Sequence, residues 1–155
     1  MREQDFPVDE VYLDSACMSL KPGQVVDKVD EYYSEYPGCS GRSGHSISKK
    51  ASNELEAARE KVAGLIDASP ERLAFTSGTT ESINTVARGF DFDRVIVSEK
   101  DHNSNHEIWE SLGCEKIVVE KPEPSLIEDE IRENDLVSFY HTSNIDGETV
   151  NAEKI

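Results

Sequence analysis

The stretch Leu73-Ala-Phe-Thr-Ser-Gly-Thr-Thr-Glu-Ser-Ile-Asn84 decides the fold assignment. A short apolar run, Leu73–Phe75, gives way to small residues and glycine, and apolar residues then return at helical spacing. A strand that turns into a helix in this way leaves free backbone N–H groups, and here also the hydroxyls of Thr79 and Thr80, at the helix N-terminus. The stretch predicts a phosphate-binding turn; the alternative is a tight turn with a helix cap.

Downstream of this turn, short apolar runs alternate with helical segments. Alternating strands and helices are typical of an α/β fold in which helices cover both faces of a mostly parallel sheet. The predicted strands are Leu73–Phe75, Val95–Val97, Ile117–Val119 and Leu136–Tyr140, and the predicted helices lie near residues 80–89, 103–112 and 125–133.

Polar side chains follow three of these strands. The phosphate-binding turn follows the first, Asp101 and His102 follow the second, and Asn144 stands in a turn after the last. Ligands of open parallel sheets bind beyond the carboxyl ends of the strands. We therefore expect Thr79, Thr80, His102 and Asn144 to converge on one edge, although each alone also fits a structural role in a cap, a loop or a turn.

The N-terminal part of the chain precedes this alternation. Pro22 stands where the first turn of a helix is expected, and residues 38–48, rich in glycine and serine, indicate a loop that carries Arg42 and His45. A second helix follows this loop. We divide the chain into a strand, helix and loop segment, 1–50, and a sheet-forming part, 51–155.

The overall charge disfavours two classes of partner. Asp and Glu number 32 against 16 Lys and Arg, and the net charge of −16 repels nucleic acid and anionic membranes. No apolar run approaches a membrane span, and residues 1–7 lack the apolar core of a signal peptide. Three irregularly spaced cysteines indicate neither a disulfide framework nor a zinc site, so we expect no metal and a cytoplasmic protein. The acidity fits either an ordinary solvated surface or adaptation to high salt.

Taken in order, the motifs resemble the class V aminotransferases, and within them the cysteine desulfurase and selenocysteine lyase group. The resemblance covers nearly the whole chain and rests on six segments. They are the opening strand Tyr12–Ala16, the helix start Lys21-Pro22, the arginine and histidine loop Gly41–Ser48, the phosphate turn Phe75–Asn84, the stacking-histidine segment Ser98–Asn105 and the asparagine turn His141–Gly147.

The resemblance implies pyridoxal 5′-phosphate (PLP) as the cofactor. Thr79 and Thr80 would donate hydrogen bonds to its phosphate at the positive end of the following helix. His102 would stack on the pyridine ring and act as the catalytic residue that handles protons. Asn144 would bond near the phenolic oxygen of the ring or the substrate carboxylate.

The resemblance also implies residues at the entrance of the site. In the family, the loop that here carries Arg42 and His45 lies near the entrance, often across a dimer interface, and Ala16 falls in the substrate-entry segment. A homodimer is therefore expected for the complete enzyme. Three departures leave the cofactor assignment intact but weaken any assignment of the substrate. They are Gly41 where a histidine is common, Asp101 where glutamate is usual, and Asn103-Ser104 where histidine or lysine followed by alanine is often found.

In the family, the residues that carry the covalent chemistry come after the asparagine turn. They are the Schiff-base lysine, the aspartate that keeps the ring nitrogen protonated, the persulfide-forming cysteine and the arginine that binds the substrate carboxylate. Lys100 precedes His102 on a strand-exit loop and is interpreted as solvated. We therefore expect residues 1–155 to be the N-terminal portion of a PLP-transferase large domain, incomplete and inactive alone.

The leading hypothesis is part of a cysteine desulfurase-like enzyme, which removes sulfur or selenium from an amino-acid substrate, gives alanine and passes the sulfur to an acceptor protein. The second is another class V enzyme, namely an aminotransferase, an epimerase or a kynureninase-like enzyme. The third is a non-catalytic remnant that acts as a binding domain. A nucleotide-binding domain is disfavoured, because neither GxGxxG nor GxxxxGK[ST] occurs.

Overall fold

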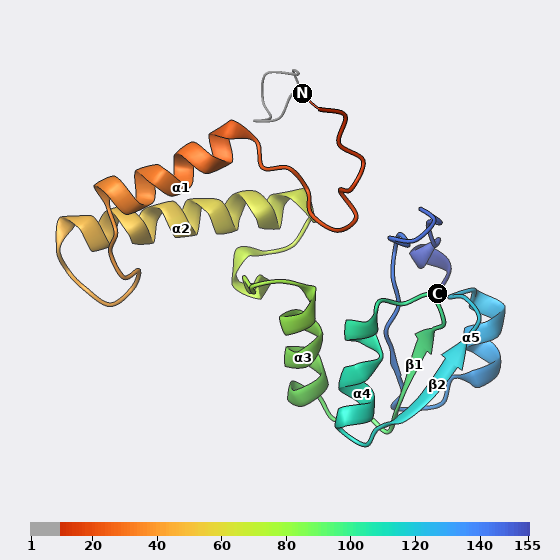
Figure 1. The fold of residues 1–155 in the computed structure, drawn as a ribbon. Coiled ribbons are helices and arrows are strands. Elements are labelled where there is room, and N and C mark those ends of the chain that lie inside the picture. Colours follow the sequence, from red (N-terminus) through yellow and green to blue (C-terminus); the bar gives the residue numbers. More distant parts are fainter. Residues whose placement is uncertain (1–9) are drawn as a thin grey trace. The chain divides into compact units, whose positions relative to one another are not determined.

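The computed structural model describes residues 10–155, so the expectation about residues 1–7 lies outside the described part. The chain forms two compact units, Met1–Phe75 and Thr76–Ile155, and each is described by itself. Figure 1 shows helices in the first unit and a sheet with helices in the second. Among residues 10–155, no helix combines the length and the apolar composition needed to cross a bilayer.

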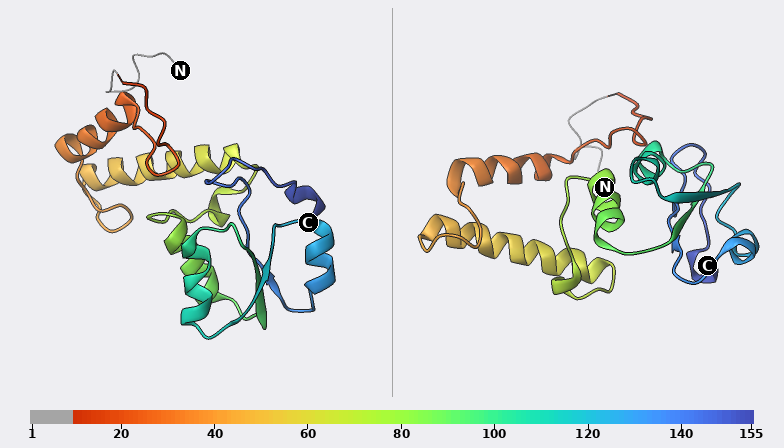
Figure 2. Two further views of the ribbon diagram at one scale, coloured as in Figure 1. Left: turned by 45° about the vertical axis from the view of Figure 1, so that its right-hand side comes forward. Right: turned by 90° about the horizontal axis from the view of Figure 1, so that it is seen from below.

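Two helices lie side by side in the first unit (Figures 1 and 2). The elements of this unit are α1 (Gly23–Glu35), α2 (Ser46–Leu65) and the 3-10 turn η2 (Pro70–Arg72). The start of α1 directly after Pro22 agrees with the sequence-based expectation. In contrast, α2 begins inside the predicted loop, because Nδ1 of His45 accepts a hydrogen bond from the backbone N of Ser48 at 3.2 Å and so caps the helix.

Charged contacts, rather than a deep core, join α1 to α2. Lys28 pairs with Glu54 at 3.0 Å, and Lys50 pairs with Glu35 at 3.0 Å. The ammonium of Lys50 also lies 4.2 Å from the ring centre of Tyr36, which is only 2% exposed. α1 buries none of its own residues, and because the paired side chains are 43–59% exposed, each ion pair adds little to the stability of the helix pair.

The second unit is a three-stranded sheet with helices on both sides, as the alternating pattern predicts. Its elements are α3 (Thr79–Gly89), β1 (Arg94–Ser98), η3 (Asn103–Asn105), α4 (Glu107–Ser111), β2 (Glu115–Val119), α5 (Pro124–Glu130), β3 (Leu136–Val137) and η4 (Ala152–Lys154). The strands are parallel in the order β2-β1-β3. The chain crosses from β1 to β2 and then back to β3, so right-handed crossovers place α4 and α5 on opposite sides (Figures 1 and 2).

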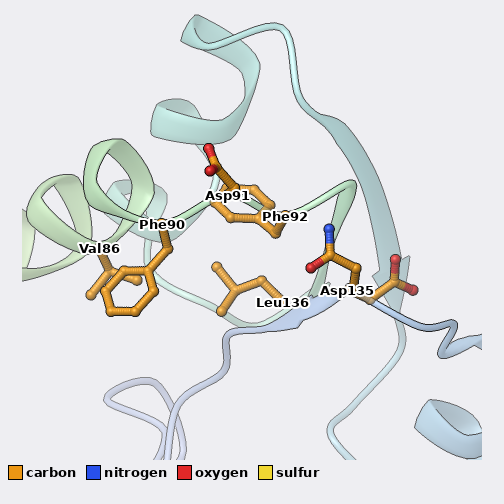
Figure 3. Close-up of a pocket in the computed structure, with 7 residues that line it drawn as sticks. Val86, Phe90, Asp91, Phe92, Asp135 and Leu136 are labelled. Atoms are coloured by element: carbon orange, nitrogen blue, oxygen red, sulfur yellow. The ribbon is translucent and has the colours of Figure 1, made fainter.

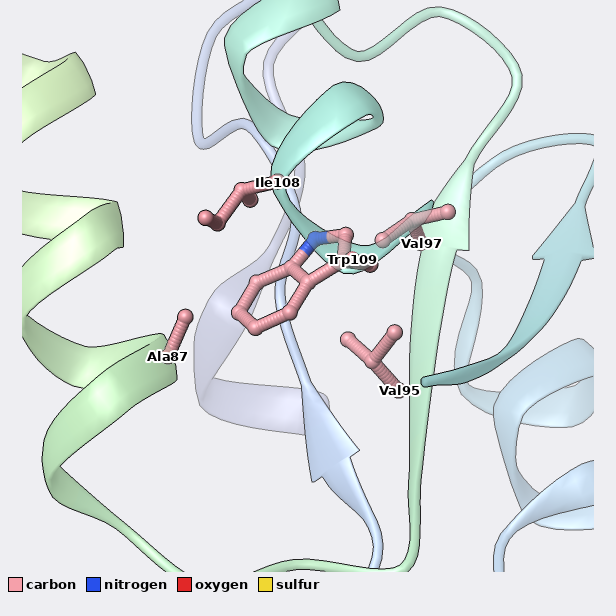
Figure 4. Close-up of a cluster of buried hydrophobic side chains, with 5 residues drawn as sticks. All are labelled: Ala87, Val95, Val97, Ile108 and Trp109. Carbon is pink, nitrogen blue, oxygen red and sulfur yellow. The ribbon is translucent and has the colours of Figure 1, made fainter. Parts of the chain in front are cut away.

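One buried cluster fills the space between α3, α4 and β1 (Figure 4). It consists of Ala87, Val95, Val97, Ile108 and Trp109. All five residues of β1 are buried, as expected for a central parallel strand. At the start of β1, Arg94 holds Asp135 through two hydrogen bonds, Nε to Oδ1 at 3.1 Å and Nη2 to Oδ2 at 2.5 Å. This bidentate pair fixes the entry of β3 beside β1.

Three predicted strands differ from the structure. Tyr12–Ala16 forms no strand and runs into a turn at residues 15–17. Leu73–Phe75 also forms no strand, because no strand of the described chain pairs with it. Instead, Arg59 donates to the carbonyl O of Leu73 at 2.5 Å and lies 5.1 Å from the ring of Phe75. The last predicted strand, 136–140, is paired only over Leu136–Val137. The predicted helix near 103–112 is divided into η3 and α4.

Candidate functional site

The predicted phosphate-binding turn lies at the N-terminus of α3. The first helical hydrogen bond runs from the backbone N of Ser82 to the carbonyl O of Gly78 at 3.1 Å, so the N–H groups of Thr79 and Thr80 have no acceptor in the helix. Within residues 10–155, no side chain caps this end. Both threonines are exposed, and a Cβ placed on Gly78 would meet no atom within 4 Å. The turn therefore presents free donors to open space.

A carboxylate fixes the upstream half of this turn. Oε2 of Glu81 accepts hydrogen bonds from both Oγ and the backbone N of Ser77, each at 2.6 Å, and these bonds lower the pKa of Glu81. The donors of Ser77 are thus used within the chain. The donors left for a ligand are those of Thr79 and Thr80.

His102 lies on the exposed loop that follows β1. Its Nδ1 lies 2.9 Å from Oγ of Ser104 and accepts a hydrogen bond from the backbone N of Ser104 at 3.2 Å, which caps η3. Because this bond requires a lone pair on Nδ1, the neutral ring carries its proton on Nε2. Nε2 is therefore the ring atom that can donate to a ligand.

Two buried polar side chains tie the His102 loop to the segment after β3. The carboxylate of Asp101 accepts a hydrogen bond from the backbone N of Tyr140 at 2.7 Å, and burial raises its pKa. The amide of Asn105 donates to the carbonyl O of Ser138 at 3.1 Å. Its Oδ1 accepts from Nε1 of Trp109 at 3.2 Å and from Oγ of Ser138 at 2.7 Å. These hydrogen bonds hold the His102 loop on its buried side and leave its exposed side free.

Asn144 is exposed in a tight turn after β3. Oγ of Ser143 accepts hydrogen bonds from the backbone N of Ile145 at 3.2 Å and of Asp146 at 3.4 Å. Gly147 donates its N–H to the carbonyl O of Ser143 at 3.0 Å, and its φ of 75° is one that glycine adopts without strain. The turn is thus closed by its own hydrogen bonds and leaves the side chain of Asn144 accessible.

Lys100 is partly exposed, as its interpretation as a solvated side chain expects, and it also forms two ion pairs. Its Nζ pairs with Asp146 at 2.8 Å and with Glu148 at 2.9 Å, and the side chain is 39% exposed. These partners lie 46 and 48 residues away in sequence, so no local pattern signals the contact.

The structure brings part of the predicted site together. Thr79 and Thr80 belong to α3, and α3 contacts the 3-10 turn η3, which His102 caps. Lys100, in the same loop as His102, forms an ion pair with Asp146 in the Asn144 turn. The three predicted entrance residues belong to the first unit. There Ala16 is exposed in a turn, Arg42 is exposed in the loop before α2, and His45 caps α2.

The cavity in Figure 3 is distinct from this candidate site. It has a volume of about 310 Å³ and is lined by Val86, Phe90, Phe92 and Leu136 among others. These residues belong to the second half of α3 and to the segments just before β1 and at the start of β3. His102 and Asn144 follow the opposite, carboxyl ends of these strands, where ligands of parallel sheets bind.

The cysteines do not form a site in the described part of the chain. Cys17 and Cys39 are exposed free thiols, and Cys114 is a half-buried one whose pKa is raised by burial. Among residues 10–155, no three His, Cys, Asp or Glu side chains are grouped so as to hold a metal ion.

Comparisons with known proteins identify what this chain is similar to. Residues 11–155 match the family model described as aminotransferase class-V. A probable cysteine desulfurase of Methanothermobacter thermautotrophicus is 39% identical over 166 residues, which cover 98% of this chain and 42% of that protein. A cysteine desulfurase of Serratia proteamaculans is 39% identical over 112 residues, which cover 68% of this chain and 28% of that protein.

A solved structure shows the same likeness in three dimensions. The apo structure of a cysteine desulfurase from Thermococcus onnurineus NA1 matches with a TM-score of 0.83 at 30% identity. The match covers 97% of this chain and 42% of that one. The chain therefore spans less than half the length of these relatives.

Proposed function

Because the chain belongs to the aminotransferase class-V family, we propose that it forms the cofactor-seating part of a PLP-dependent, cysteine desulfurase-like enzyme. The observation that carries the proposal is the open N-terminus of α3, where Thr79 and Thr80 offer unpaired N–H groups and exposed hydroxyls. Free donors and the helix dipole favour a phosphate at this position. On a chain with a net charge of −16, such a local site is needed to attract an anion.

The residues present fit PLP at three points. Thr79 and Thr80 would bind the phosphate, the ring of His102 would lie against the pyridine ring with a proton available at Nε2, and Asn144 would donate to an oxygen of the cofactor or the substrate. When bound, PLP supplies an electron-withdrawing ring that stabilises negative charge on the α-carbon of an amino acid. The role of these residues is to bind and orient.

The proposal extends to the rest of the enzyme. Its substrate would be an amino acid that carries sulfur or selenium, its product sulfur would pass to an acceptor protein, and the enzyme would be a cytoplasmic homodimer with Ala16, Arg42 and His45 near the entrance. Lys100 is held by two carboxylates, which raise its pKa and keep it protonated. In the proposed enzyme, the lysine that binds the cofactor covalently and the cysteine that takes the sulfur would lie outside residues 1–155.

Equilibrium dialysis with PLP tests the proposed phosphate site. Thr79→Val and Thr80→Val each remove a hydroxyl and should weaken PLP binding by roughly tenfold, because a hydrogen bond to a charged group contributes about 1.5 kcal/mol or more. Thr85→Val is the matched control, since its hydroxyl is bonded within α3 to the carbonyl O of Glu81 at 2.9 Å. Pyridoxal without the phosphate should bind all these proteins equally weakly.

Two results would contradict the proposal. Equal affinity for PLP and pyridoxal would show that the turn at α3 does not bind the phosphate. Borohydride treatment with PLP, followed by mass spectrometry, should find no single lysine of residues 1–155 preferentially modified; a specific adduct at one of them would show that the chain carries its own covalent lysine.

A further inference from the structure

Two successive residues after β1 each bind the segment that follows β3. The carboxylate of Asp101 accepts from the backbone N of Tyr140 at 2.7 Å. The ammonium of Lys100 pairs with Asp146 at 2.8 Å and with Glu148 at 2.9 Å. His102 directly follows Lys100 and Asp101 in the sequence. Asn144 lies between Tyr140, which Asp101 binds, and Asp146, which Lys100 binds. The two side chains proposed to meet the cofactor are therefore flanked by cross-links between their loops.

We infer that Lys100 is a positioning residue, which holds the Asn144 turn at the distance and angle to the His102 loop that the cofactor requires. The inference rests on the proposed function, because it assigns Lys100 a role only in a site that uses both side chains. Lys100 would not touch the cofactor; it would act through the turn.

The Asn144 turn keeps its shape through its own hydrogen bonds, whereas its orientation relative to the His102 loop depends on Lys100. Thr142 and Thr149 form an antiparallel bridge, and Ser143 donates its N–H to the carbonyl O of Glu148 at 2.8 Å. The turn is thus closed without any contribution from Lys100. Removing the ammonium should leave this shape intact but free the turn to swing about the segment near Tyr140. A loss of orientation lowers the fraction of molecules that are competent to bind, and the apparent affinity falls by that fraction.

Charge gives Lys100 a second effect in the same direction. One ammonium lies between two carboxylates, on a strongly acidic chain, at the edge proposed to receive a phosphate. The pairing lowers the pKa of Asp146 to about 2, chiefly through the hydrogen bond from Lys100. Without the ammonium, the two carboxylates would repel each other and the anion. Both acids are about two-fifths exposed, so added salt should screen these effects.

The test compares PLP affinity in three variants of the polypeptide that carries residues 1–155. Lys100→Met should weaken binding roughly three- to fivefold at about 0.1 M NaCl, and the deficit should nearly vanish at about 1 M, where the Debye length falls to about 3 Å. Lys100→Arg keeps the charge and should restore affinity. Lys121→Met is the control, because Lys121 is 37% exposed and its one ion pair within residues 10–155 is with Glu123, in its own loop, at 2.6 Å. It removes the same charge without cutting a cross-link.

A cofactor-free measurement makes the two proposals separable. Carboxyl NMR should find the pKa of Asp146 near 2 in the wild type and clearly higher in Lys100→Met, although still below the ordinary aspartate value, because the hydrogen bonds from Glu148 and Ser143 remain. Equal PLP affinity of the wild type and Lys100→Met, with Asp146 titrating low, would overturn the positioning role alone. An ordinary pKa of Asp146 in the wild type would overturn the pairing itself. Failure of the wild type to bind PLP would overturn the proposed function, and the role of Lys100 with it.

Discussion

Replacing Asn105 by alanine should destabilise the second unit by about 2–5 kcal/mol. The side chain is 5% exposed and makes three hydrogen bonds that join η3, α4 and the segment after β3. The indole N–H of Trp109, a residue 1% exposed, would lose its acceptor, Oδ1 of Asn105, which costs about 1–3 kcal/mol for a buried donor. Ser138 is half-buried and would lose two bonds at about 0.5–1 kcal/mol each, since water can replace part of them.

Urea unfolding followed by tryptophan fluorescence measures this effect in the relevant unit. Trp109 is the single tryptophan of the sequence and lies in the core of the second unit, so its emission reports that unit. The midpoint should fall while the slope with urea stays unchanged. Asn103→Ala, an exposed change in the same 3-10 turn, should stay within about 0.5 kcal/mol of the wild type. A shift equally small in Asn105→Ala would refute the network as a source of stability.

Two further substitutions test the packing of the first unit and the ion pair of the second. Gly38→Ala should destabilise the α1–α2 pair by about 1–3 kcal/mol in thermal unfolding followed by circular dichroism, because the added Cβ would lie 2.9 Å from backbone atoms of Ser48. Gly44→Ala meets nothing within 4 Å, and equal midpoints for the two would contradict the steric explanation. Arg94 lowers the pKa of Asp135, so this pair should stabilise the fold fully above the ordinary aspartate pKa of about 3.9 and lose that effect as pH falls through the lower folded value. The urea midpoint of Asp135→Asn should therefore depend less on pH in that acidic window, and parallel profiles would argue against the pair.

Local signals in the sequence predicted much of the fold. The apolar runs at Val95–Val97 and Ile117–Val119 became β1 and β2, and the helical pattern near 80–89 became α3. These predictions succeeded because burial and helical periodicity are properties of neighbouring residues. The predicted strand at Leu73–Phe75 was wrong because an apolar run becomes a strand only when a distant segment pairs with it, and neighbouring residues do not reveal such a partner. Instead, the guanidinium of Arg59 in α2 donates a hydrogen bond to the carbonyl O of Leu73.

The candidate site shows the same division. The donors of Thr79 and Thr80 could be predicted, because a helix start leaves its first N–H groups free wherever it occurs. Two hydrogen bonds of the site also join residues close in sequence, one from Ser77 to Glu81 and one from the backbone N of Ser104 to Nδ1 of His102. They could not be predicted, because they depend on side-chain rotamers that a sequence pattern does not specify. The pairing of Lys100 across 46 residues could not be predicted, because surface charges are abundant in this chain and most need no partner.

The order of the strands in the sheet has a consequence for biosynthesis. A chain that emerges from its N-terminus can form α3, β1, α4 and β2 before β3 is made, although β3 belongs beside the central strand. Loop closure across such separations is slow compared with local helix formation. The two carboxylates that pair with Lys100 are synthesised 46 and 48 residues after it. A nascent chain therefore forms the proposed phosphate-binding turn and the His102 loop first, and completes the ion pairs proposed to align Asn144 only after residue 148 has been added.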